Sequence, residues 1–475
     1  MRVLLIQPPT MSRIGLQAFI MVEPLGLEIV ASSLLAENKV QMLDARLDPD
    51  IRSKLASFKP EAVGVAASFT CNVYGAYSVL DAVKDYSPGI RTFVGGYHAS
   101  MCYSEFQGRA DAVVCGEGEV TAAELLRCWD NGKALDEVAG IAFQGGEGWK
   151  VTGPRPLIEN LDQVPLPARH LVAKYQEHYF MGGWRPCASV ETSRGCNHRC
   201  KFCAVWQFNR GRYREQDAET VVQQLQEVTA PYVSFADDNF FASPSRAQHI
   251  CGAIKQAGIK KLYMMQLRSD AVVGYPELIK EWVEVGLRTA FIGFESFKQD
   301  GLDSLNKHTS VQTNEEAIRI LRELHVGVMS SFIVDPDYSA EDFAGLKHYI
   351  RRTDTPLPMF FVLSPIPGTL LHRERRGELI SNDYNLYDGH HAVLPSRLGL
   401  KCFYREYVKL YTDIYLSRIL PFAVARRMAG GSPLKYVKQA LRALWLRKKF
   451  NPRSLLRHHQ RASDWPGRNE AVTEG

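Results

Sequence analysis

The segment Cys196-Asn197-His198-Arg199-Cys200-Lys201-Phe202-Cys203 (the cysteine loop) carries the strongest chemical signal of this chain. A single loop can present its three thiols to one metal centre, because all three lie close together in the sequence. Cysteine thiolates are the usual protein ligands of iron–sulfur clusters, and three ligands leave one iron of a four-iron cluster open. An open iron indicates catalysis rather than electron storage.

A tetrahedral zinc site is the alternative interpretation of these cysteines. Such a site normally needs a second pair of Cys or His residues at regular spacing, and no such pair follows nearby. His198 lies inside the loop itself. The spacing therefore favours a cluster with Cys196, Cys200 and Cys203 as its ligands.

The order C-x3-C-x-aromatic-C, with Phe202 before the last cysteine, resembles the corresponding loop of the radical S-adenosylmethionine (SAM) enzymes. This resemblance implies that the amino and carboxylate groups of SAM chelate the open iron of a [4Fe-4S] cluster. One electron from the cluster would then cleave SAM to a 5′-deoxyadenosyl radical. The motif says nothing about the substrate.

The composition is that of an ordinary soluble globular protein, and 475 residues are enough for two or three domains. Seven of the ten cysteines lie outside the cysteine loop, without the regular framework of a secreted disulfide protein. The apolar run near the amino terminus is too short for a signal peptide, and no uninterrupted apolar stretch reaches membrane-spanning length. We therefore expect a cytoplasmic protein.

The net charge of +5 is unevenly distributed, since residues 401–460 hold fourteen Lys or Arg and only two acids. Apolar residues alternate with these charges, which indicates one or two basic amphipathic helices. Such helices can pack on the protein with a solvated face, or they can contact anionic lipid at the inner face of the membrane. Nucleic acid is not expected as a partner, because no nucleic-acid module surrounds the segment.

Residues 1 to about 130 alternate short apolar runs with helical patterns. Continuous apolar strands separated by helices predict a parallel sheet with helices on both faces. Ligands of such sheets bind at the carboxyl ends of the strands. The loops expected there are Gln7-Pro8-Pro9-Thr10, Ser68-Phe69-Thr70-Cys71-Asn72, Gly95-Gly96-Tyr97-His98-Ala99 and Gly116-Glu117-Gly118-Glu119.

Together with the cysteine loop behind it, this segment resembles the cobalamin-binding domain that precedes many radical SAM enzymes, in which Gly-Gly-x-His and Gly-Glu-Gly-Glu turns recur. A Rossmann-like fold that has lost its ligand is the alternative. The resemblance implies cobalamin contacts from eight residues of these loops: Pro9, Ser68, Thr70, Gly95, Gly96, His98, Gly116 and Glu117.

The lower ligand of the cobalt is the point at which this chain departs from many cobalamin domains. Domains that ligate the metal through protein carry Asp-x-His-x-x-Gly after the first strand, whereas residues 1–97 contain no histidine. A histidine ligand from that loop is therefore excluded, which suggests a weakly ligated cobalt suited to methyl transfer. His98 belongs to a later loop and is expected to border the nucleotide tail or to act as an ordinary turn residue.

Strand and helix signals alternate again from about residue 186 to residue 375, and six βα units form a partial barrel with its active site at the carboxyl ends of the strands. The segment before them is rich in Gly and Pro. The prediction is an α/β protein in four parts: a Rossmann-like cobalamin-binding domain (1–138), a hairpin linker (139–185), a partial (β/α)6 radical SAM barrel (186–375) and a helical, basic carboxyl-terminal region (376–475).

The resemblance also assigns polar groups at successive strand ends to SAM. Asp237 or its neighbour Asp238 would accept from the methionyl amine or from substrate, and Arg268 would pair with the methionyl carboxylate. Glu295 would bond the ribose hydroxyls, and Pro367 would pack against the adenine. Each has an ordinary alternative, such as a surface ion pair or a turn, but their order behind the cysteine loop favours the assignment.

Within the cobalamin-dependent radical SAM enzymes, the resemblance implies methylation of an unactivated carbon. One SAM methylates reduced cobalamin, and a second gives the radical that removes a hydrogen from the substrate carbon, which then takes the methyl group. A reducing partner such as flavodoxin or ferredoxin is expected. The protein positions the cofactors and excludes water and oxygen.

Two segments point to a substrate class. Glu23-Pro24-Leu25-Gly26-Leu27-Glu28, and residues 387–395 followed by Phe403-Tyr404, resemble the hopanoid C-3 methylases. A basic amphipathic tail suits a membrane-resident polycyclic lipid. His390 and His391 are expected to face the substrate or the solvent.

Three other functions compete with this interpretation. The first is a tetrapyrrole enzyme, either a side-chain methylase or the oxygen-independent cyclase of chlorophyll synthesis. The second is a cobalamin-binding sensor or scaffold with an idle barrel, against which the intact cysteine loop and Glu295 argue. Methylthio transfer to RNA is the weakest, because the amino-terminal domain lacks extra cluster cysteines and no RNA-binding domain is recognised at the carboxyl end.

Overall fold

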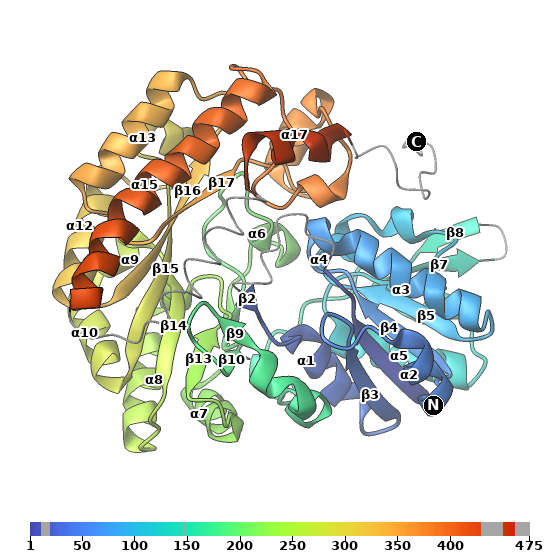
Figure 1. The fold of residues 1–475 in the computed structure, drawn as a ribbon. Coiled ribbons are helices and arrows are strands. Elements are labelled where there is room, and N and C mark those ends of the chain that lie inside the picture. The colour runs from blue at the N-terminus through green and yellow to red at the C-terminus, as the bar shows by residue number, and fades with distance from the viewer. Residues whose placement is uncertain (11–19, 146–147, 429–449, 461–475) are drawn as a thin grey trace.

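The computed structural model describes residues 1–10, 20–145, 148–428 and 450–460. It contains two largely parallel sheets that lie beside each other, with helices on the outer faces (Figure 1). Within the basic segment predicted to form amphipathic helices, residues 429–449 lie outside the described residues.

The first sheet has seven strands and is built from the amino-terminal third of the chain. Its first five strands in spatial order are parallel, and the last two are antiparallel. The spatial order is β3 (Lys39–Asp44), β1 (Arg2–Gln7), β4 (Ala62–Ala66), β5 (Arg91–Gly95), β6 (Ala112–Val114), β7 (Ile141–Gly145) and β8 (Gly148–Val151).

Helices cover both faces of this sheet, which explains why its strands are apolar along their whole length. Alternate residues of β1 enter different cores, because successive side chains of a strand point to opposite faces. Val3 and Leu5 pack with residues of α1 (Leu25–Leu34) and α5 (Gly118–Asp130). Leu4 and Ile6 pack with residues of α2 (Ile51–Phe58) and α3 (Val73–Tyr86).

The hairpin predicted in the linker is present, but its strands β7 and β8 extend the first sheet. Beyond it the chain forms two short 3-10 helices, η5 (Leu161–Gln163) and η6 (Arg169–His178). Strand β9 (Phe180–Met181) then pairs with β2 (Ile20–Met21), which ties the linker back to the start of α1.

The second sheet is the partial barrel predicted from the sequence, with six parallel strands in chain order. They are β10 (Cys187–Val190), β13 (Tyr232–Phe235), β14 (Leu262–Leu267), β15 (Leu287–Glu295), β16 (Gly327–Val334) and β17 (Pro358–Val362). Figure 1 shows the helices on the outside of this curved sheet: α7 (Ala218–Glu227), α8 (Pro244–Gln256), α10 (Pro276–Val285), α12 (Val311–Glu323) and α13 (Ala340–Arg352).

The carboxyl-terminal region contains a long helix, α15 (Leu400–Met428), which packs on α13, and a short helix, α17 (Pro452–Gln460), which packs on α15. Before them, residues 376–399 form mostly irregular structure, including the 3-10 helix η9 (Tyr384–Leu386). Among the residues that the structure describes, no helix combines the length and the apolar character needed to cross a membrane.

Candidate active site between two sheet edges

The cysteine loop begins just beyond the carboxyl end of β10, after the short strand β11 (Ser193–Arg194), and ends before α6 (Val205–Phe208). Its three thiols form no disulfide. Burial raises the pKa of each, and that of Cys203 to about 12, whereas the charges of Arg268 and Lys307 oppose the increase at Cys196 and Cys200. A metal centre deprotonates its thiol ligands outright, so raised thiol pKa values are compatible with a cluster site.

Backbone contacts hold the loop on the barrel. The Trp206 indole donates to the carbonyl of Cys200 (3.0 Å), and the Asn306 amide donates to the carbonyl of Arg199 (2.8 Å). Phe202 packs in an apolar cluster with Leu305, Leu363 and Leu371. The loop conformation is therefore fixed by α6 and by the segments that follow β15 and β17.

Arg268 and Glu295 lie where the sequence predicted them, at the ends of β14 and β15, and Lys307 joins them. The Glu295 carboxylate accepts from Lys307 Nζ at 2.8 Å, and both side chains are about one-tenth exposed. Arg268 donates through Nη2 to the Lys307 carbonyl and to Asp270, at 2.9 Å each. Lys307 is thus a buried part of the group.

Glu295 also has an unusual backbone conformation, with a φ of 62°. Non-glycine residues rarely adopt this left-handed region, and such strain is often found at functional sites. The side chain lies across Gly293, where a Cβ atom would come within 2.1 Å of Glu295 Oε1. Glycine at position 293 therefore makes room for the Glu295 carboxylate.

Asp237 is not placed as predicted. It is fully buried and accepts from the Thr192 amide (3.1 Å), the Thr192 hydroxyl (2.7 Å) and the Ser193 hydroxyl. Because Asp237 has no exposed surface, it cannot contact SAM. It instead holds Thr192 and Ser193, which lie just before the cysteine loop. Its neighbour Asp238 is exposed and accepts from the Gly195 amide at 3.3 Å, beside the loop.

The loops after β4, β5 and β6 meet at one edge of the first sheet. Gly96 has a φ of +117°, and a Cβ atom there would lie within 2.9 Å of Ser68 and Ala67. The Gly116 amide donates to the Ser100 hydroxyl at 2.9 Å. Ser68 is exposed at this edge, and Gly95 is partly exposed. Pro9, at the end of the β1 loop, packs so closely on α3 that Gly75 has no room for a Cβ atom.

Thr70 and His98 turn away from this edge. Both are buried, and His98 Nδ1 lies 3.1 Å from the Thr70 hydroxyl, while Nε2 lies 3.4 Å from Glu105. His98 has no exposed surface, so in this conformation it cannot border a nucleotide tail. Its contacts support the loop after β4 from behind.

His98, Cys102 and Glu105 place three potential metal-ligand atoms within 4.8 Å of one another. Burial alone would raise the pKa of Glu105, but His98 and the hydroxyls of Tyr384 and Tyr77 outweigh it and lower the pKa. Both carboxylate oxygens already accept from these tyrosines. Hydrogen bonds from the two tyrosines therefore already satisfy the Glu105 carboxylate of this cluster.

Glu117 likewise does not face a ligand. Its Oε1 atom accepts from Arg194 and Arg214, both at 2.8 Å, and its Oε2 atom accepts from the Ile158 amide at 2.7 Å. Arg194 lies two residues before Cys196, so this contact joins the first sheet to the cysteine loop. No local pattern marked Arg194 or Arg214 as partners of Glu117, and the sequence interpretation missed both.

Further contacts show that the carboxyl-end loops of the two sheets meet. The Tyr97 hydroxyl, after β5, donates to the carbonyl of Pro367, after β17, at 2.9 Å. Tyr97 also lies near Phe208 of α6, with ring centroids 5.9 Å apart, and Figure 1 shows α4 (Tyr97–Met101) and α6 between the two sheets. Pro367 is thus part of the contact between the domains. Both predicted ligand-binding edges border the same region.

On β15, β16 and β17 the inner face of the barrel sheet carries large apolar side chains, whereas the inward positions of β10, β13 and β14 include Ser189, Ser234 and Gln266. Alternate residues of β15 (Ala290, Ile292 and Phe294) enter the core beneath the helices, so the intervening side chains point inward. The inward positions of β15, β16 and β17 include four large apolar residues that are only partly buried: Phe291, Met329, Met359 and Phe361. None of the four belongs to a packed core cluster of the described residues. They are available to contact a ligand inside the barrel.

His390 and His391 do not face solvent, because both are buried. His391 bonds Asp388 through Nδ1 (3.0 Å) and His458 of α17 through Nε2 (2.9 Å). His390 Nδ1 lies 3.0 Å from the Tyr407 hydroxyl on α15. The two histidines therefore fasten the carboxyl-terminal helices to the segment that follows β17.

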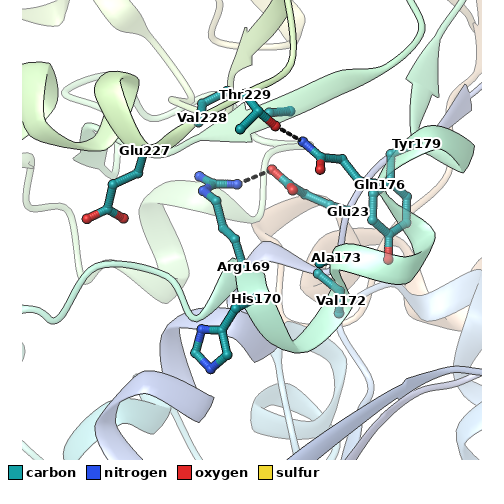
Figure 2. A pocket seen from close by; sticks show the side chains of 11 residues that line it. Glu23, Arg169, His170, Val172, Ala173, Gln176, Tyr179, Glu227, Val228 and Thr229 are labelled. Carbon is teal, nitrogen blue, oxygen red and sulfur yellow. Dashed lines mark hydrogen bonds and ion pairs between the residues drawn. The ribbon is translucent and has the colours of Figure 1, made fainter.

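A cavity of about 180 Å³ lies at the other end of the barrel, near the amino ends of β10 and β13 (Figure 2). Figure 2 shows Arg169 pointing toward Glu23, and Glu23 also accepts from the Ser189 amide. The cysteine loop follows the carboxyl end of β10, so this cavity is remote from the candidate site. The Glu23-to-Glu28 segment therefore has a structural role at this cavity, where Glu23 binds Arg169 and the Ser189 amide.

Comparisons with known proteins agree with this geometry. Residues 17–126 match the B12 binding domain, and residues 190–350 match the radical SAM superfamily. The hopanoid C-3 methylase of Methylococcus capsulatus is 33% identical over 95% of this chain and 88% of its own length. An uncharacterised methyltransferase of Pyrococcus horikoshii is 30% identical over 88% of this chain and 92% of its own.

A solved structure has the same fold. The cobalamin-dependent SAM radical enzyme OxsB, determined with aqua-cobalamin and SAM bound, superposes with a TM-score of 0.69. The match covers 97% of this chain and 71% of that chain, at 19% identity. The order of the two domains is therefore the same in both proteins.

Proposed function

Because this chain belongs to the cobalamin-dependent radical SAM methyltransferases, we propose that it methylates an unactivated carbon of a polycyclic isoprenoid lipid, C-3 of a hopanoid. Its cofactors are a [4Fe-4S] cluster, SAM and cobalamin, which supply hydrogen abstraction and methyl transfer when bound. In the net reaction a C–H bond becomes a C–CH3 bond, and the hydrogen leaves as part of 5′-deoxyadenosine. The methyl group comes from a second SAM, and a reductant such as flavodoxin or ferredoxin supplies two electrons.

Cys196, Cys200 and Cys203 hold the cluster in this proposal. Their loop lies at the carboxyl edge of the barrel and is fixed there by Trp206 of α6 and by Asn306, beyond β15. The nearby cations Arg268 and Lys307 favour a cluster surrounded by thiolates, because opposite charges stabilise each other strongly away from bulk water.

Arg268 and Glu295 hold SAM. The hydrogen bonds of Arg268 to the protein run through Nε and Nη2, which leaves Nη1 for the methionyl carboxylate. Glu295 has one oxygen on Lys307 and offers the other to the ribose hydroxyls. Asp238 takes the role first given to Asp237, since it is the exposed member of the pair.

The edge formed by Ser68, Gly95, Gly96 and Gly116 holds cobalamin, because small residues let a large ring approach the backbone. Pro9 shapes the neighbouring loop. Thr70, His98 and Glu117 act through these loops rather than by contact, since their side chains are occupied by other groups.

The apolar side chains on the inner face of β15, β16 and β17 support the choice of a lipid substrate. Phe291, Met329, Met359 and Phe361 are partly exposed there, and adaptable Met and Phe side chains suit a rigid hydrocarbon skeleton. Likeness to the hopanoid C-3 methylase over nearly the whole chain supports the same choice.

The test compares total polycyclic lipids and pigments of the native host with those of a deletion strain, both fed methyl-labelled methionine, by mass spectrometry. We expect a label-bearing methylated hopanoid to disappear in the deletion. The wild-type chain and Cys402→Ala, a cysteine on α15, should restore it, whereas Cys196→Ala should not. Unchanged hopanoids with an altered pigment would instead identify a tetrapyrrole enzyme and reject the lipid proposal.

A further inference from the structure

A largely buried group of five charged side chains joins the first sheet to a two-stranded ribbon. This ribbon consists of β11 (Ser193–Arg194) and β12 (Arg214–Glu215), and the cysteine loop lies between its two strands. Arg194 donates to Glu117 (2.8 Å), Glu119 (2.6 Å) and Glu191 (2.8 Å), and Arg214 donates to Glu117 (2.8 Å). The side chains of Glu117, Glu119 and Arg214 are less than one-tenth exposed. Two guanidinium groups thus converge on one carboxylate of the other domain.

The geometry of the turn directs both of its carboxylates at the ribbon. Gly116 has a φ of +93°, a conformation that glycine adopts without strain, and Gly118 approaches Val30 so closely that a Cβ atom would lie 3.0 Å from it. Glu117 and Glu119 therefore leave the turn on either side of a glycine and reach the same arginine. The two carboxylates of the Gly-Glu-Gly-Glu turn (the acidic clamp) thus bind Arg194, while the backbone of Gly116 stays at the edge of the first sheet.

The ribbon itself has two anchors. Arg194 of β11 is the antiparallel partner of Arg214 in β12 (Arg214–Glu215), so the clamp holds both strands. On the barrel side, Thr192 and Ser193 donate to the buried carboxylate of Asp237 at the end of β13. The cysteine loop, which begins beyond Gly195, is therefore held between the two domains by Glu117 and Glu119 of the first domain and Asp237 of the barrel.

Such a group contributes more to geometry than to stability. Removing charges from water is costly, and buried ion pairs often contribute little net folding energy. Their attraction offsets this cost only when the distance and the orientation of the two groups are close to ideal. Burial alone would raise the pKa of Glu117, yet Arg194, the Ile158 amide and Arg214 outweigh it and lower the pKa, so Glu117 is ionised at neutral pH.

We propose that Glu117 is a positioning residue that sets the distance between the cobalamin-binding edge and the cysteine loop through Arg194 and Arg214. This inference rests on the proposed cofactor positions, though not on the proposed substrate. Methyl transfer from SAM to cobalamin needs both domains in register, whereas SAM cleavage at the cluster needs only the barrel. Loss of the clamp should therefore impair the first reaction and spare the second.

The test uses the full chain with Glu117→Gln, which keeps the shape and removes the charge. Glu159→Gln is the matched control, because Glu159 forms an exposed ion pair with Arg212, two residues from Arg214. Both variants are reconstituted with cluster and cobalamin and given SAM and reductant without substrate. S-adenosylhomocysteine reports methyl transfer, 5′-deoxyadenosine reports cleavage at the cluster, and iron content reports cluster loading.

We expect Glu117→Gln to lower the ratio of S-adenosylhomocysteine to 5′-deoxyadenosine about tenfold or more, since small misplacements are costly in positioned reactions. Iron content and the ratio in Glu159→Gln should stay at the wild-type level. In the cofactor-free protein, calorimetry should show the two domains of Glu117→Gln unfolding less cooperatively than those of the wild type.

An unchanged product ratio in Glu117→Gln would overturn the proposal, and so would an equal loss of both products, which indicates general destabilisation. Glu117→Asp, which keeps the charge on a shorter side chain, should give an intermediate ratio. Because none of these measurements uses the substrate, a wrong hopanoid assignment would leave their outcome unchanged.

Discussion

Asp237 and Asp238 are neighbours in sequence with opposite surroundings. Asp237 is buried and accepts three hydrogen bonds from Thr192 and Ser193, whereas Asp238 is exposed beside Gly195. Successive residues at a strand end point in opposite directions, so one of two adjacent carboxylates must face inward. The buried carboxylate of Asp237 holds the segment before the cysteine loop, and the exposed carboxylate of Asp238 can contact a ligand.

Replacing each aspartate by alanine should distinguish the structural role of Asp237 from the proposed ligand-binding role of Asp238. Asp237→Ala leaves the Thr192 amide and two hydroxyls without their acceptor, which should lower the free energy of unfolding by about 2–4 kcal/mol. Asp238→Ala should change it by less than about 1 kcal/mol. Urea unfolding of the cofactor-free protein measures both, and equal stability of the two variants would contradict this assignment.

The closeness of the three cysteines could be predicted from the sequence, whereas the orientation of Asp237 could not, for a physical reason. Cys196, Cys200 and Cys203 act as one local loop, so their spacing alone carries the information. The orientation of Asp237 depends on Thr192 and Arg246, which come from other parts of the chain. Nothing in the local sequence records such partners.

At the scale of elements, α1 shows how a helix start can couple two domains. Glu23, just before the helix, binds Arg169 of η6 and the amide of Ser189 in β10. Glu28, in the first turn, is fully buried, and its carboxylate lies 3.7 Å from Arg169. The segment that resembled the hopanoid methylases is therefore a joint between the first sheet, the linker and the barrel.

Glu28 should make stability depend on pH. Burial, reinforced by the charge of Glu23, raises its pKa from 4.5 to about 8, so the folded protein keeps a proton that the unfolded chain releases. The stabilisation is complete below pH 4.5 and is lost as pH rises through about 8. Each unit of pKa shift corresponds to about 1.4 kcal/mol, so the loss between pH 5 and pH 8 is up to about 4 kcal/mol.

Glu28→Gln, which stays neutral, should remove most of this dependence. Chemical unfolding midpoints of the wild type and the variant, measured at pH 5 and pH 8.5, provide the comparison. We expect the wild type to lose more stability between these two values than the variant does. Parallel curves for the two proteins would show that Glu28 is ionised in the folded state.

At the scale of the whole molecule, the two α/β halves could be predicted because their strand and helix periodicities are local. The contacts between the halves could not, because they join residues far apart in the chain: Glu117 with Arg194, Tyr97 with Pro367, and Glu105 with Tyr384. The eight predicted cobalamin contacts divide accordingly. Glycines such as Gly96 lie at the edge where cobalamin is predicted to bind. The side chains of Glu117 and His98 instead bind partners that are distant in the sequence and come close only in the folded chain.

Tyr384 offers a test of this long-range framework. Its hydroxyl donates to Glu105 of the first domain, and its ring lies against His98, with centroids 4.9 Å apart. Because η9 also contacts the loop after β4, Tyr384 joins the segment beyond β17 to the predicted cobalamin edge. Loss of the hydroxyl leaves the partly buried Glu105 carboxylate with one donor fewer.

Tyr384→Phe should therefore lower the free energy of unfolding by about 1–3 kcal/mol, the usual cost of removing one partner from a buried charged group. It should also weaken the binding of hydroxocobalamin, measured by absorbance titration, because the loop after β4 loses support from Glu105 and His98. Tyr387→Phe is the matched control: its ring packs on Tyr384 at 5.5 Å, and removal of its hydroxyl should change neither quantity appreciably. If both variants bound hydroxocobalamin as the wild type does, the carboxyl-terminal segment would serve the barrel alone, and the link between the two halves would depend on Glu117 and Tyr97.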